Sequence, residues 1–528
     1  MLLTSQDYRE SLRRLKPRVF VDGRRIESIA DDPALAPGVA AIGLAYDLAR
    51  EPENRTLMVA REGSSGREVD RMLHIDRTST DLLYKLEATR MLCQRTGCAQ
   101  RYLTHDAFNA LYQVTARVDQ DCDTAYEDRF LAYMHRVQDA DLTCGVAMTD
   151  AKGDRSKRPH EQMVPDTHVR IVKRTPKGIV ISGTKAIVTG APYVHEFLVL
   201  PGRAMTKEDA DFAVACAVPL DAEGVTIVAR PAGRPGQSAA KFSARYGQST
   251  GVVLFDEVVV PWERVFLAGE WQHAHFLANT YATHHRHTCV GARAGFGDLL
   301  IGAGVMMTEA NGLDAEAMPH IRDAMVELIK VVEGFFACGV AASLYAVADD
   351  AGNVQPDPVF ANVGKLLLST QIYDMQRLAH YVSGGLIVAL PGPDEDHNPE
   401  TAGKLSEVLA GRADVPAAHR LEVARLVEDL TASYTGGWYS LISLHGGGSP
   451  EAMKREIYRS YPLQDRRELV ARLLDRGVLA GDPAHARDRQ PGRCCATGCE
   501  VPKPASRARK KNPPAKPARK PRRPQAAE

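Results

Sequence analysis

The fold of this chain is decided by the stretch LTCGVAMTDAKGDRSKRPHEQ at residues 142–162 and by RIVKRTPKGIVISGTKAIVTGAP at residues 170–192. Small and apolar residues open the stretch, and a loop dense in hydrogen-bond donors follows. Two alternating segments, 169–173 and 178–181, flank a Pro-Lys-Gly sequence, which predicts antiparallel strands joined by a tight turn. The pattern indicates a ligand loop carried on a β-sheet; a plain polar surface hairpin is the alternative.

The residue types in this stretch suit a largely hydrophobic cofactor. Residues 145–148 would form an apolar floor, and residues 149–156 supply a few polar groups. Buried area would then give affinity, while a few hydrogen bonds would set the orientation of the ligand. A flavin ring fits this description.

Length and composition predict a soluble protein of two or three domains. The chain has 528 residues, more than one core usually supports. Its 66 basic and 66 acidic residues balance, and its ten cysteines show no regular pairing. We find no signal-peptide pattern and no run of about 18 apolar residues, so we expect a cytoplasmic protein without a membrane segment.

The pattern divides the chain into four parts and predicts an α+β fold. Residues 1–140 are mostly helical, with a small hairpin at Val19–Val21 before Asp22-Gly23 and a long helix from about Thr80, capped by Thr80 or Asp81. Residues 141–272 form a β-domain, with strands predicted at 212–220, 224–230 and 251–266 in a small antiparallel sheet or barrel. Residues 273–484 form a helical bundle, and residues 485–528 a basic tail. The predicted bundle helices cover 284–307, 321–336, 359–389 and 417–444.

The basic tail is rich in Lys, Arg and Pro and has few large apolar residues. Such a segment cannot bury enough surface to fold alone, so we expect disorder. Weak, salt-dependent contact with nucleic acid or an acidic partner is the alternative. Cys494, Cys495 and Cys499 lack a fourth nearby ligand, so they do not predict a zinc site.

Two further motifs carry functional hypotheses. His284, His285 and His287 cannot share one helical face, which argues against a metal site made by the three. His285 is a candidate general acid or base, against a capped or solvent-facing histidine as the alternative. The glycines of HGGGSP, residues 445–450, would break a helix. Their N–H groups suit a phosphate, and a plain helix–loop–helix turn fits equally well.

Several blocks together resemble one family, that of the oxygenase component of 4-hydroxyphenylacetate 3-hydroxylase and of 4-hydroxybutyryl-CoA dehydratase. The resemblance covers about residues 2–480. It implies an acyl-CoA-dehydrogenase-like fold, with FAD bound between the subunits of a homotetramer or homodimer. The blocks are LTSQDYRESLRRLKPRVFVDGRRIES, AMTDAKGDRS, ISGTKAIVTGAP, FDEVVVPWERVF, HHRHTCVGARAGFGDLLIGA and HGGGSP.

The resemblance also implies which residues bind the flavin. Three residues lie against the isoalloxazine ring, four belong to the cofactor loop, one donates to the ring and four approach FAD from the bundle. In that order they are Val146, Ala147 and Met148; Lys152, Gly153, Asp154 and Arg155; Thr189; and Gly447, Gly448, Ser449 and Pro450.

At several of the positions that match the catalytic and ligand-binding residues of the two branches of the family, this chain has different residues. Of the dehydratase's iron–sulfur ligands only Cys98 and His285 are matched, because Tyr102 and Ala292 stand at the other two positions. Two ligands cannot hold a four-iron cluster, so we expect no iron–sulfur cluster and no metal. The dehydratase's acid and tyrosine positions hold residues that we expect to be unable to replace a carboxylate or a phenol. They are Thr250, Ile442 and Cys289.

Only one of the hydroxylase's substrate-binding residues is retained. Its arginine, tyrosine and histidine match Cys98, Tyr102 and Val146 in this chain. Arg101, next to the retained tyrosine, could supply the missing charge.

The sequence therefore predicts an FAD-dependent oxidoreductase, the oxygenase component of a two-component monooxygenase. A separate flavin reductase would supply reduced FAD, and the flavin would hydroxylate an aromatic or related small molecule. Tyr102 would orient or deprotonate the substrate, Arg101 would contribute charge, and His285 would donate a proton or contact the flavin. The alternatives are a cluster-free isomerase or dehydratase-like enzyme that acts on a CoA thioester with His285 as base beside FAD, and a flavin-binding or catalytically silent scaffold whose tail contacts nucleic acid.

Overall fold

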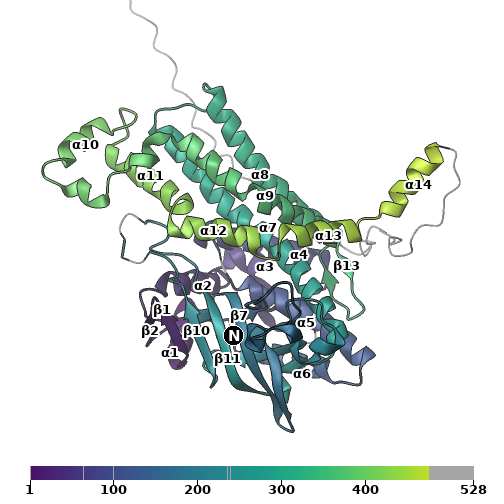
Figure 1. Ribbon diagram of the computed structural model, residues 1–528. Coiled ribbons are helices and arrows are strands. Elements are labelled where there is room, and N and C mark those ends of the chain that lie inside the picture. Colours follow the sequence, from purple (N-terminus) through teal and green to yellow (C-terminus); the bar gives the residue numbers. More distant parts are fainter. Residues whose placement is uncertain (1, 64, 99, 235, 238–239, 475–528) are drawn as a thin grey trace, which may run out of the picture. The chain divides into compact units, whose positions relative to one another are not determined.

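The computed structural model describes residues 2–63, 65–98, 100–234, 236–237 and 240–474. These residues lie within one compact unit, and Figure 1 shows their helices and sheets. The predicted basic tail and its three cysteines fall outside the described residues.

The first 140 residues are mainly helical, as predicted. Thr4 caps α1 through its side chain, and Tyr8 and Leu12 of this helix are buried. The helices are α1 (Ser5–Arg14), α2 (Ala36–Leu48), α3 (Arg55–Met58), α4 (Ser79–Thr96), α5 (Tyr102–Asp121) and α6 (Tyr126–Asp139), with a two-stranded sheet of β3 (Val59–Arg61) and β4 (Glu68–Asp70).

The predicted N-terminal hairpin is confirmed, and it has a partner that was not foreseen. Strands β1 (Arg18–Val21) and β2 (Arg24–Arg25) pair antiparallel around Asp22 and Gly23, whose φ angles are 50° and 75°. A two-residue turn of this type needs positive φ at both central positions. Strand β1 also pairs in parallel with β10 (Val225–Ala229). The helical N-terminal region therefore supplies the edge of the central sheet.

The middle region contains two sheets, with orders β2-β1-β10-β11-β7-β6 and β12-β9-β8-β5. Most pairs are antiparallel as predicted, but β5 pairs with β8, and β1 with β10, in parallel. Strand β7 runs eight residues past its predicted end, because β11 continues to pair with it as far as Thr189. The strands not yet bounded are β5 (Cys144–Ala147), β6 (Arg170–Thr175), β7 (Gly178–Thr189), β8 (Glu196–Val199), β9 (Val214–Pro219), β11 (Thr250–Pro261) and β12 (Val265–Ala268).

Long helices follow the sheets and pack into a bundle around α7 (Figure 1). The predicted helix over 417–444 is wrong in one detail, since it breaks at Ala432 and restarts behind Ser433, which caps α12. The helices are α7 (Trp271–Ala310), α8 (Pro319–Leu344), α9 (Pro358–Ser383), α10 (Ala402–Val408), α11 (Ala417–Thr431), α12 (Tyr434–His445), α13 (Pro450–Ser460) and α14 (Leu463–Leu473), with a two-stranded sheet of β13 (Val347–Ala348) and β14 (Val354–Gln355).

Helix α7 is the centre of the bundle. Its length and mean hydropathy of 1.3 would suit a membrane span, but 61% of that apolar window is buried inside the structure. Helices α4, α5, α8 and α9 pack against it. We therefore assign α7 as a core helix.

The single long helix predicted from residue 80 is in fact two helices. Thr78 and Asp81 form a capping box at the start of α4, and Gly97, with φ of 69°, ends it. A Cβ atom at Gly97 would lie 2.4 Å from the hydroxyl of Tyr439, so only glycine fits this approach. Cys98 consequently lies in the break between α4 and α5, not within a helix.

Arg101 lies in this break and is fully buried. Its guanidinium pairs with Asp70 at 2.7 Å and with Asp141, and it stacks over the ring of Tyr46 at 3.9 Å. Burial opposes ionisation of the Asp70 carboxyl and raises its pKa, whereas the charge of Arg101 lowers it. Burial is the larger effect, so the pKa of Asp70 rises to about 6. These contacts occupy the guanidinium, so Arg101 is not available for the catalytic role that the sequence predicted.

We expect Arg101→Ala to lower the free energy of unfolding by about 3–5 kcal/mol, because it leaves two buried carboxylates without their partner. Arg322→Ala is the matched control, since Arg322 pairs with Asp323 in the open and such a pair contributes about 0–1 kcal/mol. Chemical denaturation of both variants tests this. Equal losses would show that the buried network does not stabilise the fold.

Candidate active site

A small cavity lies where the break before α5, the end of β7 and the bundle helices α7, α9 and α12 meet. Its free space is about 40 Å³, room for a few water molecules at most. Both apolar and ionisable side chains line it. They are Cys98, Tyr102, Leu103, Thr189, His285, Cys289, Arg293, Lys365, Leu368, Trp438, Ile442, Ser443 and Gly446.

His285 is held from both sides. Its Nδ1 lies 2.9 Å from Oδ2 of Asp106, its Nε2 lies 3.5 Å from Sγ of Cys289, and its ring stacks on Tyr281 at 5.5 Å. Burial opposes protonation of the imidazole, but Cys289 and Asp106 outweigh burial and raise the pKa of His285 to about 10. The solvent-facing histidine that was the alternative is therefore wrong for this position, and the ring is cationic at neutral pH.

Asp106 is the buried carboxylate that orients His285. Thr288 donates to its Oδ1 at 2.6 Å, and Nζ of Lys85 lies 3.6 Å from the same oxygen. Burial alone would raise the pKa of Asp106, yet Lys85 and the neighbouring histidines hold it well below its usual range. The carboxylate stays charged and fixes one imidazole nitrogen as a donor.

Three other polar groups in the cavity, those of Tyr102, Lys365 and Arg293, have defined hydrogen-bond partners. Burial, helped by Cys98, raises the pKa of Tyr102 far above its ordinary value, so its phenol keeps its proton beside Sγ of Cys98 at 3.1 Å. Burial lowers the pKa of Lys365 to about 8, while Nζ donates to the carbonyl of Ser443 at 2.6 Å. Nε of Arg293 donates to Oγ of Ser443 at 2.6 Å. The cavity thus combines a phenol donor with cationic groups.

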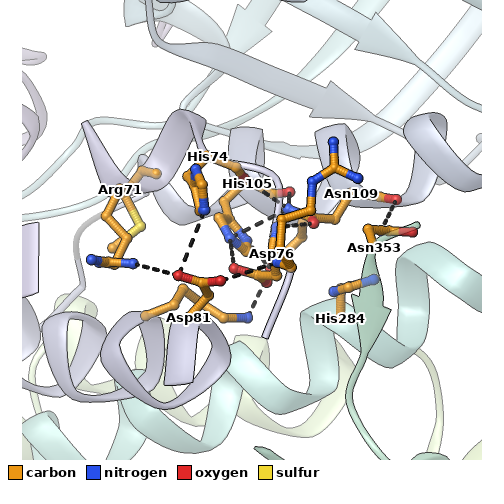
Figure 2. A network of polar contacts seen from close by, with 12 residues as sticks. Arg71, His74, Asp76, Asp81, His105, Asn109, His284 and Asn353 are labelled. Atoms are coloured by element: carbon orange, nitrogen blue, oxygen red, sulfur yellow. Dashed lines mark hydrogen bonds and ion pairs between the residues drawn. The ribbon is translucent and has the colours of Figure 1, made fainter. Parts of the chain in front are cut away.

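A polar network continues behind Asp106, and Figure 2 shows it. His105 lies 3.1 Å from Asp76, and Asn109 accepts from the backbone of Asp76 and donates to the carbonyl of His74. His284 lies at one side of the network; neither ring nitrogen has a hydrogen-bond partner among the described residues. Burial and Lys85 lower the pKa of His284 to about 3, so it is neutral in the fold.

The residues expected to bind flavin do not all meet at this cavity. Thr189 lines it, whereas Met148 and Arg155 do not. Val146 and Ala147 are buried in β5, and the loop of Lys152, Gly153, Asp154 and Arg155 is exposed, with positive φ at Lys152 and Gly153. Lys185 anchors the start of this loop by donating to the carbonyl of Met148 at 2.9 Å.

Polar atoms beside Thr189 fit a ring with hydrogen-bonding edges, such as the isoalloxazine of FAD. Both amide atoms of Gln100 and the oxygen of Gln248 are buried without a partner in the described part of the chain. Gly190, with φ of 74°, brings the backbone so close to Gln100 that a Cβ there would lie 2.7 Å from Nε2. Such unsatisfied buried groups call for a ligand or water.

The cluster ligands that the dehydratase would require do not assemble here. Among the described residues, no group of three or more His, Cys, Asp or Glu side chains is arranged to hold a metal ion. Cys98 and His285 both line the cavity, and the phenol of Tyr102 stands beside Cys98. The residues present therefore do not fit a four-iron cluster.

The segment 445–450 forms the connection predicted between two helices. Gly447 has φ of 77°, and its carbonyl accepts from Nε of Arg286 at 2.8 Å. A Cβ at Gly447 would lie 3.5 Å from His285, and Ser449 caps α13. Within this chain the glycines thus bring the backbone onto the cavity histidine. Phosphate contact by Gly447, Gly448, Ser449 and Pro450 stays a prediction.

Sequence reasoning missed Asp106, Arg293 and Lys365 and regarded Cys289 as inert. One signal was available, because His285, Cys289 and Arg293 recur every four residues and so share one face of a helix. Nothing local in the sequence marks Asp106 or Lys365, whose roles depend on burial and on partners distant in the chain.

We expect Gly447→Ala to destabilise the protein by about 1–2 kcal/mol, because a residue with a Cβ resists this left-handed backbone. Gly437→Ala is the control: Gly437 lies in α12, where an added Cβ meets nothing within 4 Å. It should gain about 0.5–1 kcal/mol from helix propensity. Urea denaturation measures both, and a loss of stability at Gly437 alone would contradict the assignment.

The neutral, buried His284 should make the fold sensitive to acid. Its folded pKa of about 3 lies below the ordinary unfolded value near 6.5, so the unfolded chain binds the extra proton. The contribution of neutral His284 to the free energy of unfolding is complete above pH 6.5 and declines as the pH falls towards 3. At pH 5 the decline amounts to about 2 kcal/mol. His284→Leu should flatten this decline in the free energy of unfolding, and the exposed His275→Gln should not. Parallel pH profiles for wild type and His284→Leu would refute this assignment.

Comparison with known proteins agrees with this architecture. Residues 4–267 match the family model described as 4-hydroxyphenylacetate 3-hydroxylase N terminal, and residues 274–475 match its C-terminal counterpart. The 4-hydroxybutyryl-CoA dehydratase/vinylacetyl-CoA-Δ-isomerase of Clostridium aminobutyricum is 33% identical over 89% of this chain and 99% of its own length. The 4-hydroxyphenylacetate 3-monooxygenase oxygenase component of Thermus thermophilus is 25% identical over 92% and 100%.

Solved structures show the same fold. An oxygen-tolerant archaeal 4-hydroxybutyryl-CoA dehydratase from N. maritimus superposes with a TM-score of 0.87 at 33% identity, covering 91% of this chain and 97% of its own. An FAD complex of the oxygenase component of 4-hydroxyphenylacetate 3-monooxygenase gives 0.80 at 23% identity, covering 89% and 98%. The predicted acyl-CoA-dehydrogenase-like α+β fold is confirmed. The chain therefore belongs to the 4-hydroxyphenylacetate 3-hydroxylase family.

Proposed function

We propose that this chain is an FAD-dependent oxidoreductase that works as the oxygenase component of a two-component monooxygenase. Its family includes oxygenase components, one of them solved with FAD. The observation that carries the proposal is the small cavity in which a protonated phenol, an imidazolium and a guanidinium converge. Such a set suits an anionic, flat substrate such as a phenolate.

The residues of this chain would bind, orient and protonate the substrate. Tyr102 keeps its proton, so it serves as a hydrogen-bond donor that orients the substrate, and the alternative of deprotonation by Tyr102 loses support. His285 is cationic and serves as proton donor through Nε2, because Nδ1 is engaged by Asp106. Arg293 and Lys365 balance a negative charge. When bound, FAD supplies the redox chemistry.

The proposed flavin site lies beside Thr189, where Gln100 and Gln248 offer unpaired amide atoms. The exposed loop of Lys152, Gly153, Asp154 and Arg155 would reach the cofactor from a neighbouring region of the surface. Gly447, Gly448, Ser449 and Pro450 would contribute across the interface of a homodimer or homotetramer. Delivery of reduced FAD by a reductase and a cytoplasmic location belong to the same proposal.

We expect Tyr102→Phe to lower hydroxylation by about 100-fold while FAD affinity changes little. Purified protein would receive reduced FAD, oxygen and a panel of para-substituted phenols, with oxygen uptake and hydroxylated product as readouts. Tyr112→Phe is the matched control on the same helix, since the Tyr112 hydroxyl pairs with Arg77 outside the cavity. Absence of hydroxylated product with every phenol would reject the monooxygenase.

A second candidate is a cluster-free isomerase of a CoA thioester. The 33% identity and TM-score of 0.87 with the dehydratase branch favour it, and the His285–Cys289 pair offers an acid and a base. Anaerobic conversion of a vinylacetyl-CoA-type thioester, without oxygen uptake in the phenol assay, would establish this reading. A colourless protein without measurable FAD affinity would leave the silent scaffold.

A further inference from the structure

Two side chains that line the cavity, Cys289 and His285, and a carboxylate buried behind them, Asp106, stand in the order nucleophile, base and orienting group. Sγ of Cys289 lies 3.5 Å from Nε2 of His285, and Nδ1 of the same ring lies 2.9 Å from Oδ2 of Asp106. A catalytic thiol is activated when a base lies within hydrogen-bonding distance of it and a third group orients that base.

The charges around Cys289 favour its thiolate. Burial opposes ionisation of the thiol, but His285, Lys365 and Arg293 together lower its pKa. Tyr102, Tyr281 and Arg286 also face Cys289, and none of these three supplies a negative charge at neutral pH. A cationic surrounding of this kind is typical of reactive cysteines.

A second, independent feature points to a ligand with an oxygen atom. Arg293 lies two helical turns beyond His285 on the same face of α7, lines the cavity and is only 5% exposed. Its Nε is used by Ser443, but its Nη1 has no hydrogen-bond partner among the described residues. A buried guanidinium N–H without a partner is costly unless a ligand accepts from it.

We propose that Cys289, His285 and Asp106 form a nucleophilic site that adds reversibly to a small conjugated carbonyl compound, whose oxygen accepts from Nη1 of Arg293. Cys289 attacks, His285 transfers the proton, and Asp106 is a positioning residue. A conjugated carbonyl fits better than a simple ester or amide. Direct attack at a carbonyl carbon calls for donors at the carbonyl oxygen, one bond away from the attacked carbon, whereas here the free donor lies one helical turn from the thiol.

The addition balances without any oxidant or reductant. Sγ of Cys289 forms a bond to the β-carbon, the π electrons of the C=C bond shift to give an enolate, and Arg293 receives the enolate oxygen. Nε2–H of His285 then protonates the α-carbon, leaving a neutral imidazole. Reversal of these steps releases the conjugated compound.

Acrylamide, a small conjugated amide, is the probe for the unmodified full-length chain. It is incubated with the protein at pH 7 without added FAD and without oxygen, and peptide mass spectrometry follows each cysteine. Cys122 and Cys338 are internal controls, because each of them, like Cys289, is neither fully buried nor fully exposed, while burial raises the pKa of both. We expect Cys289 to react about tenfold faster than either, since a larger thiolate fraction outweighs its weaker nucleophilicity. Equal or slower reaction would overturn the proposal.

Two variants separate the roles of the imidazole and the guanidinium. His285→Gln should slow the reaction of Cys289 with both acrylamide and iodoacetamide by about tenfold, because the thiolate loses its cation. Arg293→Lys should slow acrylamide addition by about tenfold more than iodoacetamide alkylation, because only the conjugated reagent develops an enolate oxygen. If Arg293→Lys slows both reagents equally, the assigned ligand class is wrong. Because no flavin or phenol enters these assays, their outcome does not depend on the proposed monooxygenase activity.

Discussion

The site depends on the buried carboxylate of Asp106. A charge removed from water is costly unless other groups compensate it, and here the compensating groups come from three helices: Lys85 on α4, His105 on α5 itself, and His285 and Thr288 on α7. Meeting all of these contacts requires one rotation and one height of α7 against α5. The same contacts that satisfy the carboxylate therefore direct His285 into the cavity.

Burial also sets the protonation states on which the chemistry rests. The phenol of Tyr102 stays protonated because its anion would have to leave water, and Lys365 gives up its proton more readily for the corresponding reason. The pKa of His285 rises instead, because its two anionic partners, Cys289 and Asp106, outweigh the effect of burial. One small cavity thus holds a proton donor, a hydrogen-bond donor and a thiol that favours its anion.

This chain shares its architecture with a dehydratase and with the oxygenase components of monooxygenases. It does not have the complete set of site residues that the resemblance implies for either enzyme. Cys289 stands where the resemblance places the dehydratase's tyrosine, and a thiol alone in a helix would be a poor acid or base. Beside the imidazole of His285, however, the pKa of the Cys289 thiol is lowered, which favours the thiolate. Arg101, by contrast, is next to Tyr102 in the sequence and was expected to offer its charge to the substrate. In the structure its guanidinium instead forms ion pairs with Asp70 and Asp141. Neighbours in space reversed both expectations.

From the sequence alone, periodicity, turn residues and glycines predicted the succession of a helical, a β and a second helical region, the Asp22-Gly23 hairpin and the helix break at residues 445–450, since these depend on local backbone preferences. The family blocks determined the fold. Only the tertiary structure decided that the N-terminal hairpin joins the central sheet, that Gly97 splits a helix to expose Cys98 to the cavity, and that Asp106 orients His285. Those features arise from contacts between residues far apart in the chain, where burial and charge compensation act and local pattern carries no information.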